Sequence, residues 1–120
     1  MASFNFKRDW LYLVPTILVS LMMIASAFFY LTQTPDVQAE FARLGFPTWI
    51  PIPLAIMKLL AVAAIWLSPS KLIRHFAYAG LFFNFLLAFA AHGQSGDGWL
   101  TPALGAAVFI AVAAFKDPRD

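Results

Sequence analysis

One lysine in this sequence lies where a charge is costly. Lys58 is the single charged residue of Ile50–Leu67, an apolar stretch with the length of a membrane-spanning helix. A cation near the middle of such a span costs about 2.5–3.5 kcal/mol on insertion scales, so it must face protein or water. Its ammonium can bind an anion, a polar headgroup or a quinone carbonyl. The alternatives are a structural lysine bonded to backbone carbonyls loosened by Pro51 and Pro53, and snorkelling to an interface.

Polar side chains of two other apolar stretches are expected at the same depth as Lys58. Ser20 and Asn84 each lie near the middle of such a stretch. Each can accept a hydrogen bond from the ammonium, but neither supplies a negative charge. Aromatic side chains would hold the ring of a bound molecule. The candidate ligand-binding residues are Lys58, Asn84, Tyr78 and His92.

A second group of polar residues is expected at the outer surface of the membrane. His92, Asp97 and Glu40 combine an imidazole with carboxylates, which can relay protons. The reading we favour is a helix end at His92 followed by a Gly-rich turn that contains Asp97. His75 stands among basic residues and is expected to contact solvent or lipid headgroups. The sequence contains no phosphate-binding loop, nucleophile elbow or metal-ligand spacing, so we predict no catalytic residues and no metal site.

The elements that must position these residues are long apolar runs. The chain has 120 residues, of which 62% are hydrophobic and 12% are charged, whereas soluble domains are about 25% charged. Runs this long and uniform predict membrane-spanning helices rather than barrel strands. We therefore predict an all-α integral membrane protein, a four-helix bundle forming one domain over residues 1–120. The expected spans are Trp10–Leu31, Ile50–Leu67, Leu72–Ala91 and Trp99–Phe115.

The distribution of charge and tryptophan sets the expected orientation. Six of the eight basic residues precede the first run, separate the second from the third, or follow the fourth. The positive-inside rule then puts both termini in the cytoplasm, and the four tryptophans fall at span ends. Ala25-Ser26-Ala27 resembles a signal-peptide cleavage site, but the apolar run continues beyond it and favours a full span. The net charge of +2 is not gathered into a patch, and the sequence has no cysteine. Nucleic acid binding and thiol chemistry are therefore not expected.

Two local patterns predict finer structure. Apolar residues at helical spacing within Asp36–Leu44 predict an outer amphipathic helix that Pro35 opens and Gly45 ends. Small residues at four-residue spacing predict faces that contact neighbouring helices. These residues are Gly80, Asn84, Ala88 and His92 in the third run, and Ala103, Ala107 and Ala111 in the fourth.

Several short motifs occur in order along the chain, from about Ser26 to Asp97. They are Tyr30-Leu31-Thr32, Leu44-Gly45-Phe46-Pro47, Met57-Lys58-Leu59-Leu60, Phe76-Ala77-Tyr78-Ala79-Gly80, and His92 followed by Gly96-Asp97. This ordered set resembles the DoxX-like family of small bacterial membrane proteins. The resemblance implies a four-helix membrane bundle. It also implies a quinone-linked or redox-linked role, because relatives include membrane subunits of a thiosulfate:quinone oxidoreductase and of another oxidoreductase complex.

These observations lead to one functional hypothesis and two alternatives. We expect an accessory subunit of the bacterial inner membrane that binds a quinone or a similar lipophilic molecule near Lys58, Asn84 and Tyr78. Quinone is the only cofactor expected, no independent catalysis is expected, and a redox protein would supply the electrons. Membrane lipid is an expected partner, and homo-oligomer formation stays open. The alternatives are a non-catalytic protein that assembles or anchors another complex, and a small-solute carrier.

Overall fold

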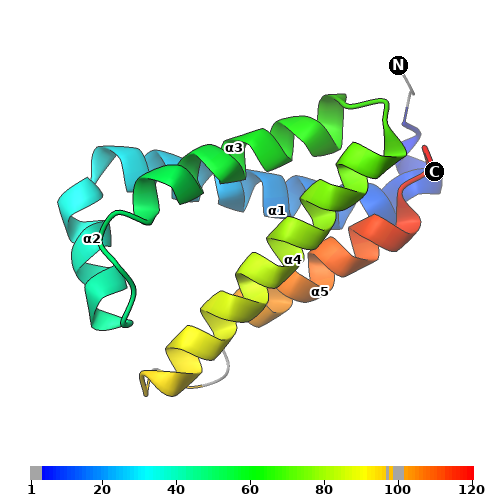
Figure 1. Ribbon diagram of the computed structural model, residues 1–120. Helices are drawn as coiled ribbons and strands as arrows, with labels where there is room; N and C mark the ends of the chain where they lie inside the picture. The colour runs from blue at the N-terminus through cyan, green and yellow to red at the C-terminus, as the bar shows by residue number, and fades with distance from the viewer. Residues whose placement is uncertain (1–3, 97, 99–101) are drawn as a thin grey trace.

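The computed structural model describes residues 4–96, 98 and 102–120 and folds them entirely into helices, turns and loops. The all-α prediction is confirmed for this part of the chain, and the four apolar runs each match a helix to within a few residues (Figure 1). Trp99, the expected start of the last run, lies outside the described residues. The helices are α1 (Phe6–Thr32), α2 (Thr34–Arg43), α3 (Pro51–Leu67), α4 (Lys71–Gln94) and α5 (Pro102–Lys116).

Length and hydropathy make two of these helices candidates for crossing a membrane. α1 has 27 residues and α4 has 24, and both are strongly apolar. α3 and α5 are equally apolar in character but have 17 and 15 residues. Large apolar side chains cover the outside of the molecule, including Phe28 on α1, Leu60 on α3 and Phe76 on α4. An apolar exterior of this extent indicates a lipid-facing surface or a large interface.

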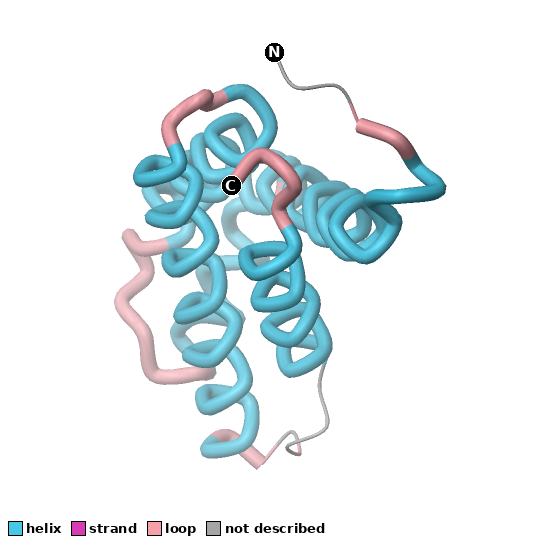
Figure 2. The backbone as a smooth tube through the Cα atoms, turned by 90° about the vertical axis from the view of Figure 1, so that its right-hand side faces the viewer, coloured by secondary structure: helices cyan, strands magenta, loops and turns pink. Residues whose placement is uncertain are grey.

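The long helices form two pairs that diverge from one end of the molecule. α1 packs on α3 and α5, and α4 also packs on α3 and α5. Figure 1 shows the pair α1–α3 and the pair α4–α5 spreading apart, away from the turn 68–70. Figure 1 and Figure 2 show that the two described ends of the chain lie at the same end of the molecule as this turn, and Figure 1 shows α2 at the opposite end of the α1–α3 pair. We call the first end the terminal end and the second the α2 end.

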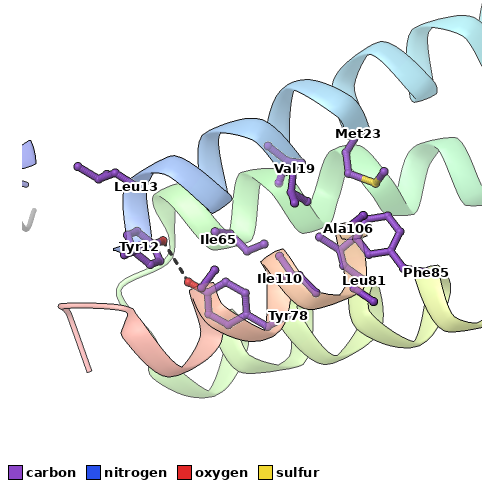
Figure 3. Packing of buried hydrophobic residues seen from close by; sticks show 13 residues of the cluster. Tyr12, Leu13, Val19, Met23, Ile65, Tyr78, Leu81, Phe85, Ala106 and Ile110 are labelled. Carbon is purple, nitrogen blue, oxygen red and sulfur yellow. Dashed lines mark hydrogen bonds between the residues drawn. The ribbon is translucent and has the colours of Figure 1, made fainter. Parts of the chain in front are cut away.

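The hydrophobic core fills the space where the pairs meet. Ile65, Leu81 and Ile110, from three different helices, are at most 1% exposed. Figure 3 shows these side chains converging between the helices, with Tyr12 and Tyr78 at one margin. The two helix pairs are close together here, and they separate toward the α2 end (Figure 1).

The small-residue stripe predicted for α4 is wrong in part. Gly80 is exposed, and no atom of another helix lies within 4 Å of the point where a β-carbon would stand. Phe85, which is not part of the predicted stripe, is only 3% exposed. The buried face of α4 runs through Tyr78, Leu81 and Phe85, whose large side chains fill the space between α4 and the other helices. On α5 the prediction holds at Ala107, which is 2% exposed.

The amphipathic helix predicted after the first run is confirmed as α2. Pro35 lies in its first turn, and Gly45 follows its end with a φ of +90°, where glycine is favoured. Val37 is buried, and α2 contacts both α1 and α3. The Phe41 ring meets the Tyr30 ring of α1, with 5.7 Å between centroids. α2 therefore closes the α1–α3 pair at the end where the two pairs are furthest apart.

Candidate functional site

A cavity of about 350 Å³ lies between the two helix pairs at the α2 end. All five helices and the loop after α2 contribute to its walls, which are mostly apolar and leave it partly open. We call it the Lys58 cavity. Its polar and aromatic lining includes Ser26, Tyr30, Phe41, Lys58, Asn84 and His92.

Lys58 is buried on the wall that α1 and α3 form. Lys58 is 3% exposed, and its Nζ donates a hydrogen bond to Ser26 Oγ at 2.8 Å. Nζ also lies 3.9 Å from the centroid of the Tyr30 ring, a favourable cation–π geometry. Within the described part of the chain, Lys58 forms no ion pair with a carboxylate. Among these residues, the ammonium therefore contacts one hydroxyl and one ring and no carboxylate.

The serine beside Lys58 differs from the expected one. Ser20 accepts a hydrogen bond from Trp66 Nε1 at 2.8 Å instead of contacting the lysine. Depth must be counted from the α2 end, where α1 and α3 are linked, and from there Ser26 and Lys58 each lie about two turns in. α1 is longer than α3, so its extra turns extend toward the terminal end and shift its midpoint away from Lys58.

Two further predicted residues reach the Lys58 cavity from α4. Asn84 and His92 are half-buried and line it together with Lys58. Glu40 of α2 also lines it and forms an ion pair with Arg43 across one turn. Of the three residues predicted at the outer surface, His92 and Glu40 therefore line one cavity, and Asp97 lies outside the described residues.

Tyr78 is apart from the other predicted site residues. It does not line the Lys58 cavity and is 2% exposed near the terminal end. Its hydroxyl donates to Asp117 Oδ2 at 2.7 Å and lies 3.1 Å from the Tyr12 hydroxyl. Because a hydroxyl has one hydrogen, Tyr12 is the donor between the two tyrosines (Figure 3).

Asp117 belongs to a buried network that the sequence analysis missed. Arg74 is 1% exposed, and its Nε donates to Asp117 Oδ2 at 3.1 Å. Its two terminal nitrogens donate to the Ser68 carbonyl at 3.0 Å and to Asp120 Oδ1 at 2.7 Å. His75, expected to contact headgroups, has Nε2 2.6 Å from Asp120 Oδ2. The segment after α5 is thus fixed to the start of α4.

Arg119 completes this network from the same segment. Its Nε donates to Asp117 Oδ1 at 2.9 Å, and one terminal nitrogen donates to the Tyr12 hydroxyl at 2.7 Å and to the Ile65 carbonyl at 2.6 Å. We call the set of Tyr12, Arg74, Tyr78, Asp117, Arg119 and Asp120 the tail clasp. A signal for it was present, because two aspartates follow the last apolar run on the side that carries most of the basic residues.

The carboxylates of the tail clasp are held in the ionised form. Burial by itself would raise the pKa of Asp117, but hydrogen bonds from Arg119 and Tyr78 outweigh burial and lower the pKa. At Asp120, burial likewise acts to raise the pKa, but hydrogen bonds with His75 and Arg74 outweigh it, so the pKa is lowered. Both carboxylates therefore stay charged at neutral pH and balance the buried guanidinium groups.

Comparison with known proteins identifies a family. No curated protein and no solved structure gives a match. The model of the DoxX-like family matches residues 14–115, which include α2, α3, α4, most of α1 and α5, and the described lining of the Lys58 cavity. The resemblance seen in the sequence motifs is therefore confirmed, and the chain belongs to the DoxX-like family of membrane proteins.

Proposed function

We propose that this chain is a multi-pass protein of the bacterial inner membrane in which α1, α3, α4 and α5 all cross the bilayer as a four-helix bundle. The apolar exterior of the four helices supports this arrangement. The terminal end carries the turn 68–70, most of the basic residues and both described chain ends, so the positive-inside rule puts it in the cytoplasm. The Lys58 cavity then lies toward the outer leaflet.

In this membrane the protein binds a lipophilic ligand in the Lys58 cavity, as an accessory subunit of a quinone-linked redox system. The observation that carries the proposal is a buried ammonium that forms no ion pair with any described carboxylate, at the wall of a partly open, mostly apolar cavity. The cavity volume of about 350 Å³ is within the range of small-molecule sites, about 300–1,000 Å³. A molecule with an apolar body and one oxygen at its head fits this chemistry.

Each part of the cavity has a role in holding a quinone. Lys58 Nζ donates to a carbonyl oxygen, and the Asn84 amide offers a second polar contact from the opposite helix pair. Tyr30, Phe41 and Phe85 provide aromatic faces for the ring. The chain holds and orients the quinone, and a partner redox protein supplies the electrons.

The form of the cavity favours ligand binding over solute transport. A carrier requires a path that continues toward the other side of the membrane. Leu81 and Ile110 are at most 1% exposed in the core between the Lys58 cavity and the terminal end. The tail clasp ties the helices together beyond them. A site with one closed end supports storage or presentation of a ligand.

The test is quinone binding by the purified full chain in detergent. Wild type is compared with Lys58→Met, which keeps the length of the side chain and removes the ammonium. Lys116→Met makes the same change at an exposed lysine and is the matched control. We expect saturable binding of decyl-ubiquinone by wild type and control, and a loss of about tenfold or more in Lys58→Met. Absence of saturable binding in all three proteins would overturn the proposal and leave the assembly or anchoring role.

A further inference from the structure

We propose that the head of the ligand in the Lys58 cavity carries one ionised oxygen, as in a carboxylate or an acidic ring hydroxyl. This inference rests on the proposed function, because it concerns the same cavity, but it goes further by specifying the charge of the ligand. The titratable side chains described around the cavity are Lys58, Glu40 and His92.

The charge of Lys58 is not balanced from within the described residues. Its Nζ contacts the Ser26 hydroxyl and the Tyr30 ring, neither of which is an anion. Glu40 lines the cavity, but its carboxylate forms an ion pair with Arg43 of the same helix. A buried charge without a partner is strongly unfavourable. A ligand oxyanion would supply the missing charge, whereas a neutral carbonyl would supply only a dipole.

The rest of the molecule shows how this fold treats other buried cations. Arg74 is 1% exposed and meets two carboxylates, those of Asp117 and Asp120. Arg119 is mostly buried and meets Asp117. Lys58, at 3% exposed, has the same burial and no such partner among the described residues. The exception coincides with the cavity, so a ligand bound there is in position to supply the balancing charge.

The walls of the cavity define the body that carries the oxyanion. Met23, Leu54 and Phe85 line it with apolar surface, and the space between the helix pairs leaves it partly open. An alkyl chain or a single substituted ring can fill such a space while its head lies at Lys58. The ligand class is therefore an amphiphilic monoanion. Two sources share this chemistry: a fatty acid of the membrane and a hydroxylated quinone.

The experiment compares each anion with a neutral twin of the same shape. Dodecanoate is paired with dodecanol, and a 2-hydroxy-3-alkyl-1,4-naphthoquinone, ionised at neutral pH, is paired with its methyl ether. Binding of each compound to the purified full chain in detergent is measured by calorimetry for wild type, Lys58→Met, Lys58→Arg and Lys116→Met. Circular dichroism and gel filtration verify that each variant is folded. Because the twins partition into the same micelles for every variant, differences between variants report the protein site.

The expected result is a preference that depends on the charge at position 58. Wild type, Lys58→Arg and Lys116→Met should bind at least one anion about tenfold more tightly than its neutral twin, and Lys58→Met should lose the preference. The anion that binds identifies the source. Equal binding of the anion and the neutral twin by wild type would overturn this inference and leave the proposed function standing. Failure of all four compounds, together with decyl-ubiquinone, would overturn both.

Discussion

At the terminal end of the molecule, two buried guanidinium groups meet carboxylates, whereas the buried ammonium at the α2 end meets, among the described residues, a hydroxyl and a ring but no carboxylate. Arg74 and Arg119 share Asp117, whose oxygens accept from both and from the Tyr78 hydroxyl. Lys58 has Ser26 and Tyr30. The charged side chains of the tail clasp balance one another without a ligand, so we infer that the tail clasp stabilises the fold.

The difference between the two regions separates stability from binding. Removing one member of a completed ion-pair network lowers the free energy of unfolding of the protein, because the remaining charge is left buried. Removing the unbalanced group of an incomplete site raises the free energy of unfolding, and the protein loses only its capacity to bind the ligand. The same kind of change, neutralisation of one charged side chain, should therefore have opposite effects on stability at the two ends.

The largest effect is expected for Asp117→Asn in the tail clasp. The change removes the charge that balances Arg74 and Arg119, and breaking a buried pair of this kind costs about 3–5 kcal/mol. The free energy of unfolding is measured by SDS titration of the protein in mixed micelles. Asp36→Asn makes the same change at an exposed carboxylate of α2 and should be neutral. Equal stability of the two variants would show that the tail clasp does not stabilise the fold.

Acid should remove the same contribution in wild type. The pKa values of Asp117 and Asp120 are lowered in the folded protein, so their contribution is present above the unfolded pKa, about 3.9. It is lost as the pH falls through the lowered folded values. Thermal unfolding measured from pH 7 downward should show a steep fall below about pH 4 in wild type. The double variant Asp117→Asn/Asp120→Asn should show a much shallower fall, and parallel curves would contradict the prediction.

Lys58→Met should change stability in the opposite direction. Removing a central charge relieves an insertion cost, and the loss of the Ser26 and Tyr30 contacts offsets part of it, so we expect a gain of up to about 2 kcal/mol. The gain is measured by the same SDS titration, with Lys116→Met as the neutral control. A loss of stability comparable to that of Asp117→Asn would mean that Lys58 is a structural residue, and the contrast between the two ends would fail.

Tyr78→Phe should lower the free energy of unfolding by less than Asp117→Asn does. The change removes one hydrogen bond to an ionised carboxylate, worth about 1.5–3 kcal/mol, and keeps the ring. Tyr12→Phe removes a hydroxyl that accepts a hydrogen bond from the Arg119 guanidinium and contacts Tyr78, and it should cost a similar amount. Quinone binding should be unchanged in both variants, since neither residue lines the Lys58 cavity. Loss of binding in Tyr78→Phe alone would return Tyr78 to the ligand site.

Features encoded locally were predictable from the sequence, and those that depend on register between helices were not. Apolar runs predicted the long helices, and Pro35 and Gly45 predicted both ends of α2. The insertion cost of a charge predicted that Lys58 would be buried. These signals lie within single segments of the chain.

The contacts between helices needed information that no single segment contains. Ser26, rather than Ser20, contacts Lys58 because the two helices are aligned from their α2 ends, and α1 is the longer. Arg74 and Asp117 lie 43 positions apart, and charge alone gave either of them several candidate partners. The position of Tyr78 outside the Lys58 cavity follows from the divergence of the helix pairs, which no spacing in the sequence reports.

The smallest effect is expected for Gly80→Ala on α4, between the two regions. If Gly80 belonged to a tight helix contact, as its spacing suggested, a methyl group would collide with a neighbour and lower stability. The structure leaves 4 Å of free space around that position, so alanine should stabilise the helix by about 0.5–1 kcal/mol. Ala107→Val adds bulk at a site that is 2% exposed and should be destabilising. A gain of stability for Gly80→Ala in the SDS titration would support the contact of α4 with its neighbours through Tyr78, Leu81 and Phe85, and a loss would contradict it. Bulky side chains on that face keep the helix pairs far enough apart for a cavity to form at Lys58.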